Sequence, residues 1–422
     1  MRVPRRLLLV GVLVAGLPAL RQAQAQDGTP TLLQARKGHK TRLTSAAQAV
    51  AVLPAPPEDE FELLEYPGPL GAMGAYVTPD PGDGERHPAI VWIVGGFPPG
   101  CDGATAWERA PVTNDQSAGQ YRRAGIVMMF PSFRGSGGNP GRQESFYGEV
   151  DDVIAAAKHL RSLDYVDPKR VYLGGHSTGG TLALLVAECT NVFRGVIAFG
   201  PVTSPANYGA EALTYDPDNA KENDLRSPVE FVGGITTPTW AIEGDGGNID
   251  SLRALAQAST NPKLRCVTIA GANHFDVLAP VNRVIADRIV ALSGPEPLDL
   301  DAAALQRAFD AQHRATREAD ALDTLAALRR AGVELDKPQT ARHYLLSRDR
   351  AALAKAATAA KTDGFDVRPI TEQKDRDGDA YFVLVLAKRL TPSDLKAVFA
   401  TAASIEKLAR GHDLQYDGWN VE

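Results

Sequence analysis

The stretch Val171-Tyr172-Leu173-Gly174-Gly175-His176-Ser177-Thr178-Gly179-Gly180 decides the fold of this chain of 422 residues. It sets the pattern G-x-S-x-G between a strand-like run at 170–173 and a helix-like run at 181–188. Such a turn lifts the serine above the edge of a sheet, at a helix N-terminus whose N–H groups favour developing negative charge. The stretch therefore predicts that Ser177 is a nucleophile. The alternative interpretation is a glycine-rich turn with an incidental serine.

The segments around this stretch alternate between strand and helix patterns. Continuous apolar runs at 89–94 and 125–130 suit strands buried on both faces of a parallel sheet. Helical spacing follows at 149–163. This order predicts an α/β fold with a doubly wound, mostly parallel sheet over residues 59–293. Further strands are expected at 62–66, 74–77, 195–200, 239–243 and 264–269, and a closing helix at 281–292.

His274 is the candidate general base. A serine hydroxyl is a weak nucleophile until a base accepts its proton. His274 follows the last expected strand, in a loop opened by Gly271, and precedes the closing helix. A fold of this type places its histidine there, after the serine and the acid. No other histidine has this placement, and His176, beside the nucleophile, is expected to shape the turn.

Acyl transfer also needs two backbone donors for the oxyanion. Thr178, directly after the serine, supplies one of them by its position. The other is expected from the loop after the strand at 89–94, where Gly96 or Phe97 carries the N–H group. A glycine pair at a strand end also occurs in plain turns, but the turn at Ser177 favours the functional interpretation.

Three more motifs lie in order before the serine. They read Phe133-Arg134-Gly135-Ser136-Gly137-Gly138-Asn139-Pro140-Gly141, Phe146-Tyr147-Gly148-Glu149-Val150-Asp151-Asp152-Val153 and Val166-Asp167-Pro168-Lys169-Arg170-Val171. Together they resemble the catalytic domain of prolyl-oligopeptidase-like, dipeptidyl-aminopeptidase-like serine hydrolases, over about residues 60–292. The resemblance implies a triad of Ser177, an Asp and His274. The segment before this domain is too short for the β-propeller that restricts oligopeptidases to short peptides, so peptide, amide and ester substrates are all open.

The position of the triad acid departs from that family. Related hydrolases commonly carry an Asp a few residues beyond the glycine that ends the preceding strand, and here that register falls on Gly247. Asp245 and Asp250 are the two candidates in this loop. Asp250 also suits a helix N-cap and Asp245 a turn, so each has a structural alternative. We favour Asp250, because the glycine pair 246–247 could fold back and bring the helix start under His274.

The chain beyond residue 293 predicts a second domain. Residues 294–319 are expected to form a helical linker, and a β-α-β-β-α order over 320–422 suits a small ferredoxin-like α+β domain. Leu325-Ala326-Ala327-Leu328-Arg329-Arg330-Ala331-Gly332-Val333-Glu334-Leu335, Lys337-Pro338 and the ending Tyr416-Asp417-Gly418-Trp419 resemble the family of the regulator of ribonuclease E activity B. Members of that family bind a ribonuclease in the cytoplasm. We carry over the fold and not the inhibition of a ribonuclease, and we expect a partner-binding or structural module.

The first residues predict export. Three early arginines precede an apolar stretch at 7–20 and the small-x-small pattern Ala23-Gln24-Ala25, which is typical of a signal peptide over 1–25. Its removal takes four arginines and no acid, so the net charge falls from −6 to −10. A chain this acidic excludes nucleic acid and anionic membrane surfaces as electrostatic partners. Residues 26–58 are polar and proline-rich and predict a flexible lead-in to the domain.

These observations predict a periplasmic or secreted serine hydrolase that cleaves an ester or a peptide or amide bond through an acyl-enzyme. No cofactor or metal is expected, since the three cysteines are isolated and the histidines do not pair at ligand spacing. The expected partners are a small-molecule or peptide substrate and a protein that binds the C-terminal domain. The alternative is an inactive hydrolase fold that serves as a scaffold, motivated by the irregular acid loop.

Overall fold

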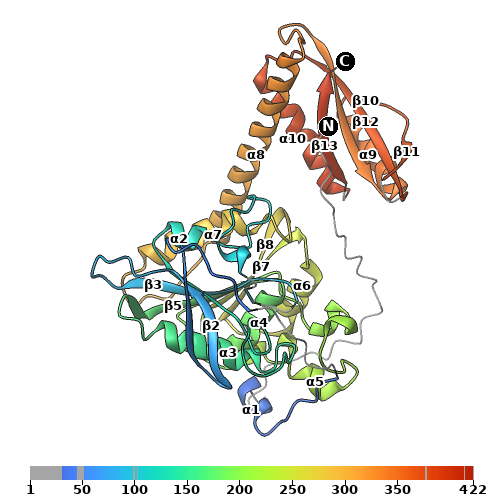
Figure 1. Ribbon diagram of the computed structural model, residues 1–422. Helices are drawn as coiled ribbons and strands as arrows, with labels where there is room; N and C mark the ends of the chain where they lie inside the picture. The colour runs from blue at the N-terminus through green and yellow to red at the C-terminus, as the bar shows by residue number, and fades with distance from the viewer. Residues whose placement is uncertain are drawn as a thin grey trace.

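The computed structural model describes residues 31–44, 52–97, 100–101, 103–375, 378–412 and 414–421. The predicted signal peptide lies outside these residues. Two domains share the described part of the chain and are joined by one long helix (Figure 1). Among the described residues, no helix combines the length and the apolar character needed to span a membrane. All three cysteines are free thiols.

The first domain is built on an eight-stranded sheet in the order β1-β2-β4-β3-β5-β6-β7-β8. Strands β3 to β8 run parallel, while β1 and β2 are antiparallel additions at one edge. This arrangement confirms the predicted doubly wound α/β fold. The strands are β1 Glu62–Gly68, β2 Gly71–Val77, β3 His87–Ile93, β4 Val127–Pro131, β5 Val166–His176, β6 Val196–Phe199, β7 Thr239–Gly246 and β8 Leu264–Asn273.

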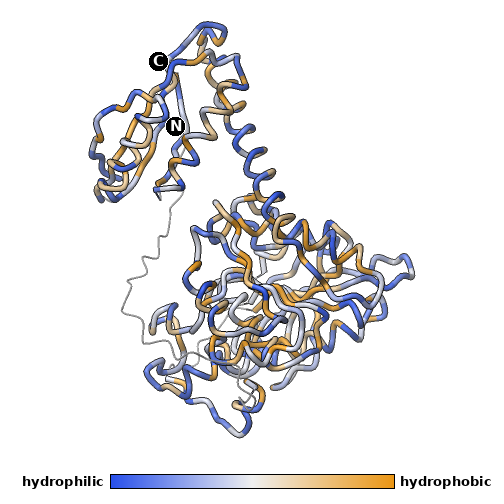
Figure 2. The backbone as a smooth tube through the Cα atoms, turned by 180° about the vertical axis from the view of Figure 1, so that it is seen from behind, coloured by the Kyte–Doolittle hydropathy of each residue, from blue (hydrophilic) through white to orange (hydrophobic). Residues whose placement is uncertain are grey.

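Helices cover both faces of this sheet and enclose two hydrophobic cores (Figure 2). One core contains side chains of α3 (Glu149–Leu160), α4 (Thr178–Ala187) and α6 (Ile249–Ala258). The other contains side chains of α2 (Gln120–Arg123) and α7 (Leu278–Ala291). Because β3 and β4 are buried on both faces, their sequences read as the continuous apolar runs that identify them.

The chain order of the sheet reverses at β3. The chain passes from β3 outward to β4 and then returns to β5 on the other side of β3. In open α/β sheets, ligands bind outside the carboxyl ends of the strands at such a switch point. Here the loop after β3 and the turn after β5 meet at that point, and these are the two segments predicted to carry the oxyanion donors and Ser177.

The lead-in is packed where the structure describes it, in contrast to the flexible segment predicted for 26–58. Helix α1 (Leu32–Arg36) buries Leu32 completely, and the Arg36 guanidinium donates to the Tyr147 carbonyl at 2.7 Å and pairs with Asp151 at 2.9 Å. Leu53 is buried in the second core. These partners are far away in sequence, so local composition gave no sign of them.

Residues 39–42 of the lead-in also clamp α5 (Ala220–Asp224), which belongs to the segment between β6 and β7. The Glu222 carboxylate accepts from the Thr41 hydroxyl at 2.8 Å and from the Arg42 N–H at 3.0 Å, and it pairs with Arg226 at 2.7 Å. Burial alone would raise the pKa of Glu222, but these hydrogen bonds and the Arg226 charge lower it to about 2. Residues 39–42 therefore fix the segment between β6 and β7 through the buried carboxylate of Glu222.

The C-terminal domain is an α+β sandwich, as predicted. Its antiparallel sheet has the order β10-β12-β9-β13, with β11 also paired to β12. Side chains of α9 and α10 share one core with this sheet. Its elements are β9 Gln339–Ser347, α9 Arg350–Thr362, β10 Asp366–Val367, β11 Thr371–Lys374, β12 Ala380–Leu390, α10 Leu395–Gly411 and β13 Gln415–Val421. The last strand is absent from the sequence prediction; with it, β9, β10, β12 and β13 form the ferredoxin-like four-stranded sheet, to which β11 is added beside β12.

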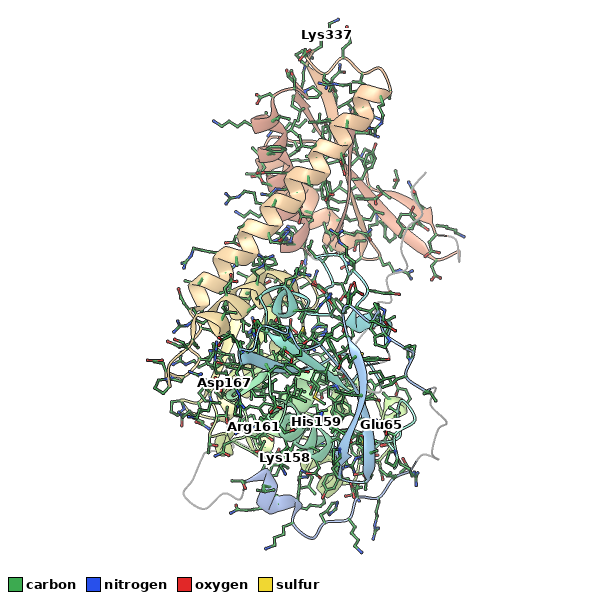
Figure 3. All side chains as sticks on the ribbon, turned by 60° about the vertical axis from the view of Figure 1, so that its left-hand side comes forward. Glu65, Lys158, His159, Arg161, Asp167 and Lys337 are labelled. Atoms are coloured by element: carbon green, nitrogen blue, oxygen red, sulfur yellow. The ribbon has the colours of Figure 1, made fainter. Side chains whose placement is uncertain are left out.

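Helix α8 (Ala302–Arg330) runs without a break through the predicted linker and into the C-terminal domain. It buries Leu305 and Phe309 in the second core of the first domain and Ala321 in a small cluster of the C-terminal domain. Figure 2 shows that its middle is mainly hydrophilic. Lys337, shortly after α8, lies at the end of the C-terminal domain farthest from the first domain (Figure 3). The two domains are thus joined by a rigid element and not by a loop.

The clamp at Glu222 predicts a pH-dependent loss of stability. Replacing Glu222 with Gln leaves Arg226 without its buried counter-charge and should lower the free energy of unfolding by about 3 kcal/mol. The pKa of Glu222 is lower in the folded chain than the usual 4.5, so its contribution is present above pH 4.5 and is lost as the pH falls toward 2. Urea unfolding at several pH values measures this. Glu211→Gln, at an exposed site of the same segment, is the control; equal stability of the two variants would contradict the prediction.

Candidate active site

Ser177 lies on a strained turn between β5 and α4. Its backbone has a φ of 57° and a ψ of −116°, a combination that residues with a side chain rarely adopt. The turn is held because the Ser177 N–H donates to the Phe199 carbonyl of β6 at 2.8 Å. The serine is followed at once by α4, whose first N–H groups have no acceptor within the helix. This is the predicted strand-turn-helix context.

The two glycines of G-x-S-x-G are required by close backbone contacts. A Cβ atom on Gly175 would lie 2.4 Å from the Gly179 carbonyl oxygen, and one on Gly179 would lie 2.2 Å from the Ile93 carbonyl oxygen. Both distances are far below van der Waals contact, so any side chain would push α4 away from β3 and β5. Glycine is therefore required at both positions.

His274 follows β8 and reaches back over the end of β6. Its Nδ1 lies 2.8 Å from Oε2 of Glu243. Gly200, directly after β6, contacts the imidazole, because a Cβ there would lie 2.3 Å from the His274 Cε1 atom. Since Phe199 accepts from Ser177 and the next residue touches His274, the serine and the histidine lie over the same strand end. Nδ1 donates to the carboxylate, which leaves Nε2 as the basic nitrogen.

Glu243 is the acid beside His274, and it lies within β7 and not in the loop after it. Its side chain is fully buried. Besides the imidazole, Oε1 accepts from the Gly244 N–H at 2.8 Å and Oε2 from the Asn248 N–H at 3.0 Å. Three donors from three positions thus stabilise a carboxylate that has no access to water.

Gly247 provides the space that this carboxylate occupies. A Cβ atom on Gly247 would lie 2.5 Å from Oε1 of Glu243. Gly247 is also the position on which the family register of the triad Asp falls. The acid therefore reaches the same place from a different backbone position: Glu243 is one methylene longer than Asp, starts from the strand, and fills the volume that a side chain at 247 would take.

The predicted acids Asp245 and Asp250 do not contact His274, so the expectation for both is wrong. Asp250 lies in the first turn of α6, where its side chain is 94% exposed and pairs with Arg253 at 3.1 Å. Asp245 accepts a hydrogen bond from the Gly271 N–H at 2.8 Å and so ties β7 to the loop that opens toward His274. The N-cap of α6 is Asn248 and not Asp250, and Asp245 bonds to β8 and not within a turn, so neither takes the structural role that was its alternative. The glycine pair does not fold α6 back under the histidine.

The loop after β3 lies against the turn at Ser177. A Cβ on Gly95 would lie 3.0 Å from the Ser177 Cβ, and the Thr178 hydroxyl donates to the Gly96 carbonyl at 2.7 Å. The structure thus brings the candidate oxyanion donors Thr178, Gly96 and Phe97 to one place beside the serine. Phe97 itself is 41% exposed and borders the site from the solvent side.

His176 contacts both the ring and the backbone carbonyl of His274. Its fully buried ring lies 4.5 Å from the His274 ring, centroid to centroid, and its Nε2 lies 2.8 Å from the His274 carbonyl oxygen. Burial and the His274 charge lower the pKa of His176 to about 3, so the ring is neutral at working pH. Because a carbonyl oxygen only accepts, Nε2 carries the proton. His176 therefore does more than shape the turn: it fixes the backbone of the base.

An aromatic cluster forms one side of the site. Tyr208 packs edge-on against Phe97 at 5.2 Å and stacks on Phe146 at 6.0 Å. Its hydroxyl lies 2.8 Å from the Thr181 hydroxyl. Burial raises the pKa of this phenol, so it stays protonated.

The two other aromatic residues of the 202–234 segment do not join this cluster. Tyr215 is buried under Arg226, with the guanidinium carbon 4.2 Å from its ring centroid. Phe231 packs against the first core. The segment therefore contributes Tyr208 to the site, while Tyr215 and Phe231 serve its own packing.

The sheet topology and the turn at Ser177 define the α/β-hydrolase class. Within it, residues 114–234 match the prolyl oligopeptidase family, and residues 318–421 match the family described as regulator of ribonuclease activity B. Both resemblances that the sequence motifs indicate are thus confirmed. The first match supports a serine peptidase or esterase.

The C-terminal match extends to a curated relative. The regulator of ribonuclease activity B of Alteromonas mediterranea is 34% identical over 101 residues, which cover 24% of this chain and 74% of that protein. Through its C-terminal domain, the chain belongs to the regulator of ribonuclease activity B family. An uncharacterised protein of Mycobacterium tuberculosis is 30% identical over 168 residues, or 39% of this chain. The chain spans 59% of the length of that relative.

Solved structures of hydrolases are similar over more than half of the chain. A 2,6-dihydroxy-pseudo-oxynicotine hydrolase gives a TM-score of 0.46 at 15% identity, covering 58% of this chain and 72% of its own. A puromycin hydrolase gives 0.44 at 17% identity, covering 57% and 41%. An esterase of Pyrobaculum calidifontis gives 0.41 at 18% identity, covering 56% and 87%.

The relation between Glu243 and Gly247 predicts a reciprocal exchange of the acid. Glu243→Gln should slow the reaction of Ser177 with a fluorophosphonate by about 10³- to 10⁴-fold, because the amide cannot hold His274 in the productive tautomer. Gly247→Asp should also be impaired, since its side chain meets the Glu243 carboxylate. The double variant Glu243→Ala with Gly247→Asp should recover part of the rate by restoring an acid from the loop.

Asp250→Asn is the matched control, and it should react like the wild type because Asp250 is exposed. If Glu243→Gln reacts at the wild-type rate while Asp250→Asn is slow, the assignment of Glu243 is wrong.

Proposed function

We propose that the protein is a serine hydrolase that cleaves an ester or a peptide or amide bond through an acyl-enzyme, with Ser177, His274 and Glu243 as its triad. The observation that carries this proposal is the 2.8 Å contact between His274 Nδ1 and the buried Glu243 carboxylate, beside the turn that exposes Ser177. The prolyl oligopeptidase match over residues 114–234 supports the same class of enzyme.

The geometry supports the following chemistry. His274 Nε2 accepts the proton of Ser177 as the serine oxygen bonds to the substrate carbonyl carbon. Glu243 stabilises the imidazolium that forms, and the N–H groups of Thr178 and of the loop after β3 donate hydrogen bonds to the negatively charged carbonyl oxygen. The imidazolium then protonates the leaving group. Water, activated by the same histidine, releases the acyl group and restores the serine.

The surroundings of Ser177 favour an apolar acyl group. Phe97, Phe146 and Tyr208 present their rings on the side of the oxyanion loop. Phe275, next to His274, is 41% exposed on the histidine side. These rings offer a hydrophobic wall next to the reacting carbonyl.

The scaffold alternative loses its motivation. It rested on the irregular loop after β7, which lacks an Asp in the family register. Since Glu243 contacts His274 from β7, the loop no longer indicates an inactive site.

Labelling of the purified chain with a fluorophosphonate tests the proposal. Wild type should label quickly, Ser177→Ala should not label, and His274→Ala should be slowed by several orders of magnitude. Comparison of p-nitrophenyl esters with aminoacyl p-nitroanilides then separates esterase from peptidase activity. A correctly folded wild type that fails to label would refute the hydrolase proposal.

We also propose that the mature protein acts in the periplasm or outside the cell. The support is the arginine-led apolar stretch at 7–20 followed by Ala23-Gln24-Ala25. Fractionation of expressing cells, with mass spectrometry of the N-terminus, should find a chain that begins at Gln26 in the exported fraction. A chain that keeps residues 1–25 and stays in the cytoplasm would contradict export and make a cytoplasmic partner for the C-terminal domain plausible.

A further inference from the structure

The segment that carries His274 is contacted by both of the long helices that belong to the C-terminal half of the chain. It consists of residues 270–276, at the end of β8 and the start of the turn to α7. β8 is the edge strand of the sheet. Figure 1 shows α8 rising from beside β8 and α7, with α10 next to its upper part. The catalytic base therefore lies at the boundary between the two domains.

A side chain of α8 bonds to the backbone of β8 at this edge, where a neighbouring strand would otherwise pair. The side-chain amide of Gln306 accepts from the Ala270 N–H at 2.8 Å and donates to the Ala270 carbonyl at 3.0 Å. Phe309, one turn later, is buried in the same core as Ala272. The strand that leads into His274 is thus fixed on its open side by residues of α8.

The turn around His274 is closed by one carboxylate. Asp276 accepts from the Asn273 N–H at 2.7 Å and from the Asn273 side-chain amide at 3.1 Å. Asn273 in return accepts from the N–H groups of Phe275 and Asp276 at 2.8 and 3.0 Å. His274 lies between these two residues, so the orientation of Asp276 sets the direction in which the imidazole leaves the backbone.

The C-terminal domain holds Asp276 through two residues. His313 of α8 lies 3.5 Å from Asp276, and Arg410 of α10 contacts the His313 ring nitrogens at 2.7 and 2.8 Å. Arg410 also pairs with Glu406 at 3.4 Å, which in turn pairs with Arg317 at 3.1 Å. The charged groups that face this pair are thus Asp276 from the turn, Glu406 from α10 and Arg317 from α8.

Arg410 also contacts the segment that carries His274 directly, at Gly271. A Cβ atom on Gly271 would lie 2.7 Å from Nη1 of Arg410, and the guanidinium carbon lies 6.0 Å from the Phe309 ring centroid. Gly271, within β8, has a φ of +78°, so the strand bends here, and Asp245 of β7 accepts from its N–H. One cation of the C-terminal domain therefore packs where the strand bends toward His274.

We propose that Arg410 and His313 are positioning residues for His274, so that the C-terminal domain sets the reactivity of Ser177 in the hydrolase domain. The proposal rests on the hydrolase function proposed above. Half-exposed ion pairs such as these contribute little to stability. Their effect is geometric: they fix the turn that aims the base, and small misplacements of a catalytic group slow an enzyme strongly.

The test uses the full-length chain with Arg410→Met, which keeps an apolar stem and removes the charge. The kcat for a p-nitrophenyl ester should fall about three- to tenfold with KM unchanged, because the base is less well aimed while the substrate site is intact. At low salt the acid limb of the kcat/KM profile should move to higher pH, since the loss of a nearby cation favours the protonated imidazole. Arg410→Lys should restore most of the pH profile.

Lys407→Met is the matched control. Lys407 is an exposed cation one turn earlier on α10, beside Asp363 and Ser404 and away from residues 270–276. It should keep the wild-type kcat and pH profile. Melting temperatures of both variants should equal that of the wild type. The lower kcat of Arg410→Met would then result from the position of His274 and not from unfolding.

A double-mutant cycle tests the route through Asp276. If Arg410 acts through His313 and Asp276, the effect of Arg410→Met on kcat should largely disappear in an Asp276→Asn background. Full additivity of the two substitutions would overturn that route.

The outcomes separate the two proposals. If the wild type hydrolyses esters and labels at Ser177, but Arg410→Met behaves like Lys407→Met, the positioning role is refuted and the hydrolase function stands. If the wild type is inert, the hydrolase function fails and the positioning role falls with it.

Discussion

The buried carboxylate of Glu243 is the constraint on which the rest of the active site depends. A carboxylate without access to water is stable only when its oxygens are paired, and here the partners come from Gly244, Asn248 and His274. The Asn248 side chain also donates to Gly200 at 3.0 Å, so the start of α6 is tied to the end of β6. Three segments therefore stabilise one another: the loop after β7, the end of β6 and the turn at His274.

Ser177 and His274 could be predicted because their signals are local. The close contacts that demand glycine at 175 and 179 leave a readable pattern, and His274 stands directly after a recognisable strand. Glu243 was not predicted because it lies inside an apolar strand, whose pattern indicates buried core. Its signal was present: a charged residue that closes the run Thr239-Trp240-Ala241-Ile242 must have buried partners.

The elements that the sequence did not predict are those whose partners lie far away. Residues 31–44 read as a polar lead-in, yet Arg36 and Thr41 are held by Asp151 and Glu222, more than a hundred residues later. Strand β13 is polar and carries a bulge between Tyr416 and Trp419, since it pairs only with β9 at the edge of its sheet. Local composition does not show which distant residue supplies a buried counter-charge. Nor does it show which strand has an open edge for pairing.

The unbroken course of α8 restricts how the length of this chain can vary in evolution. Each residue of an α-helix adds 1.5 Å and a rotation of about 100°. A single inserted residue between Phe309 and Ala321 would swing the C-terminal domain around the helix axis and carry α10 away from the edge of β8. Insertions or deletions near whole numbers of turns would keep the same face toward the sheet. They would still shift α10 along the axis by 1.5 Å for each residue, so homologues that keep its contact with residues 270–276 should conserve the length of α8, while the loops on either side vary freely.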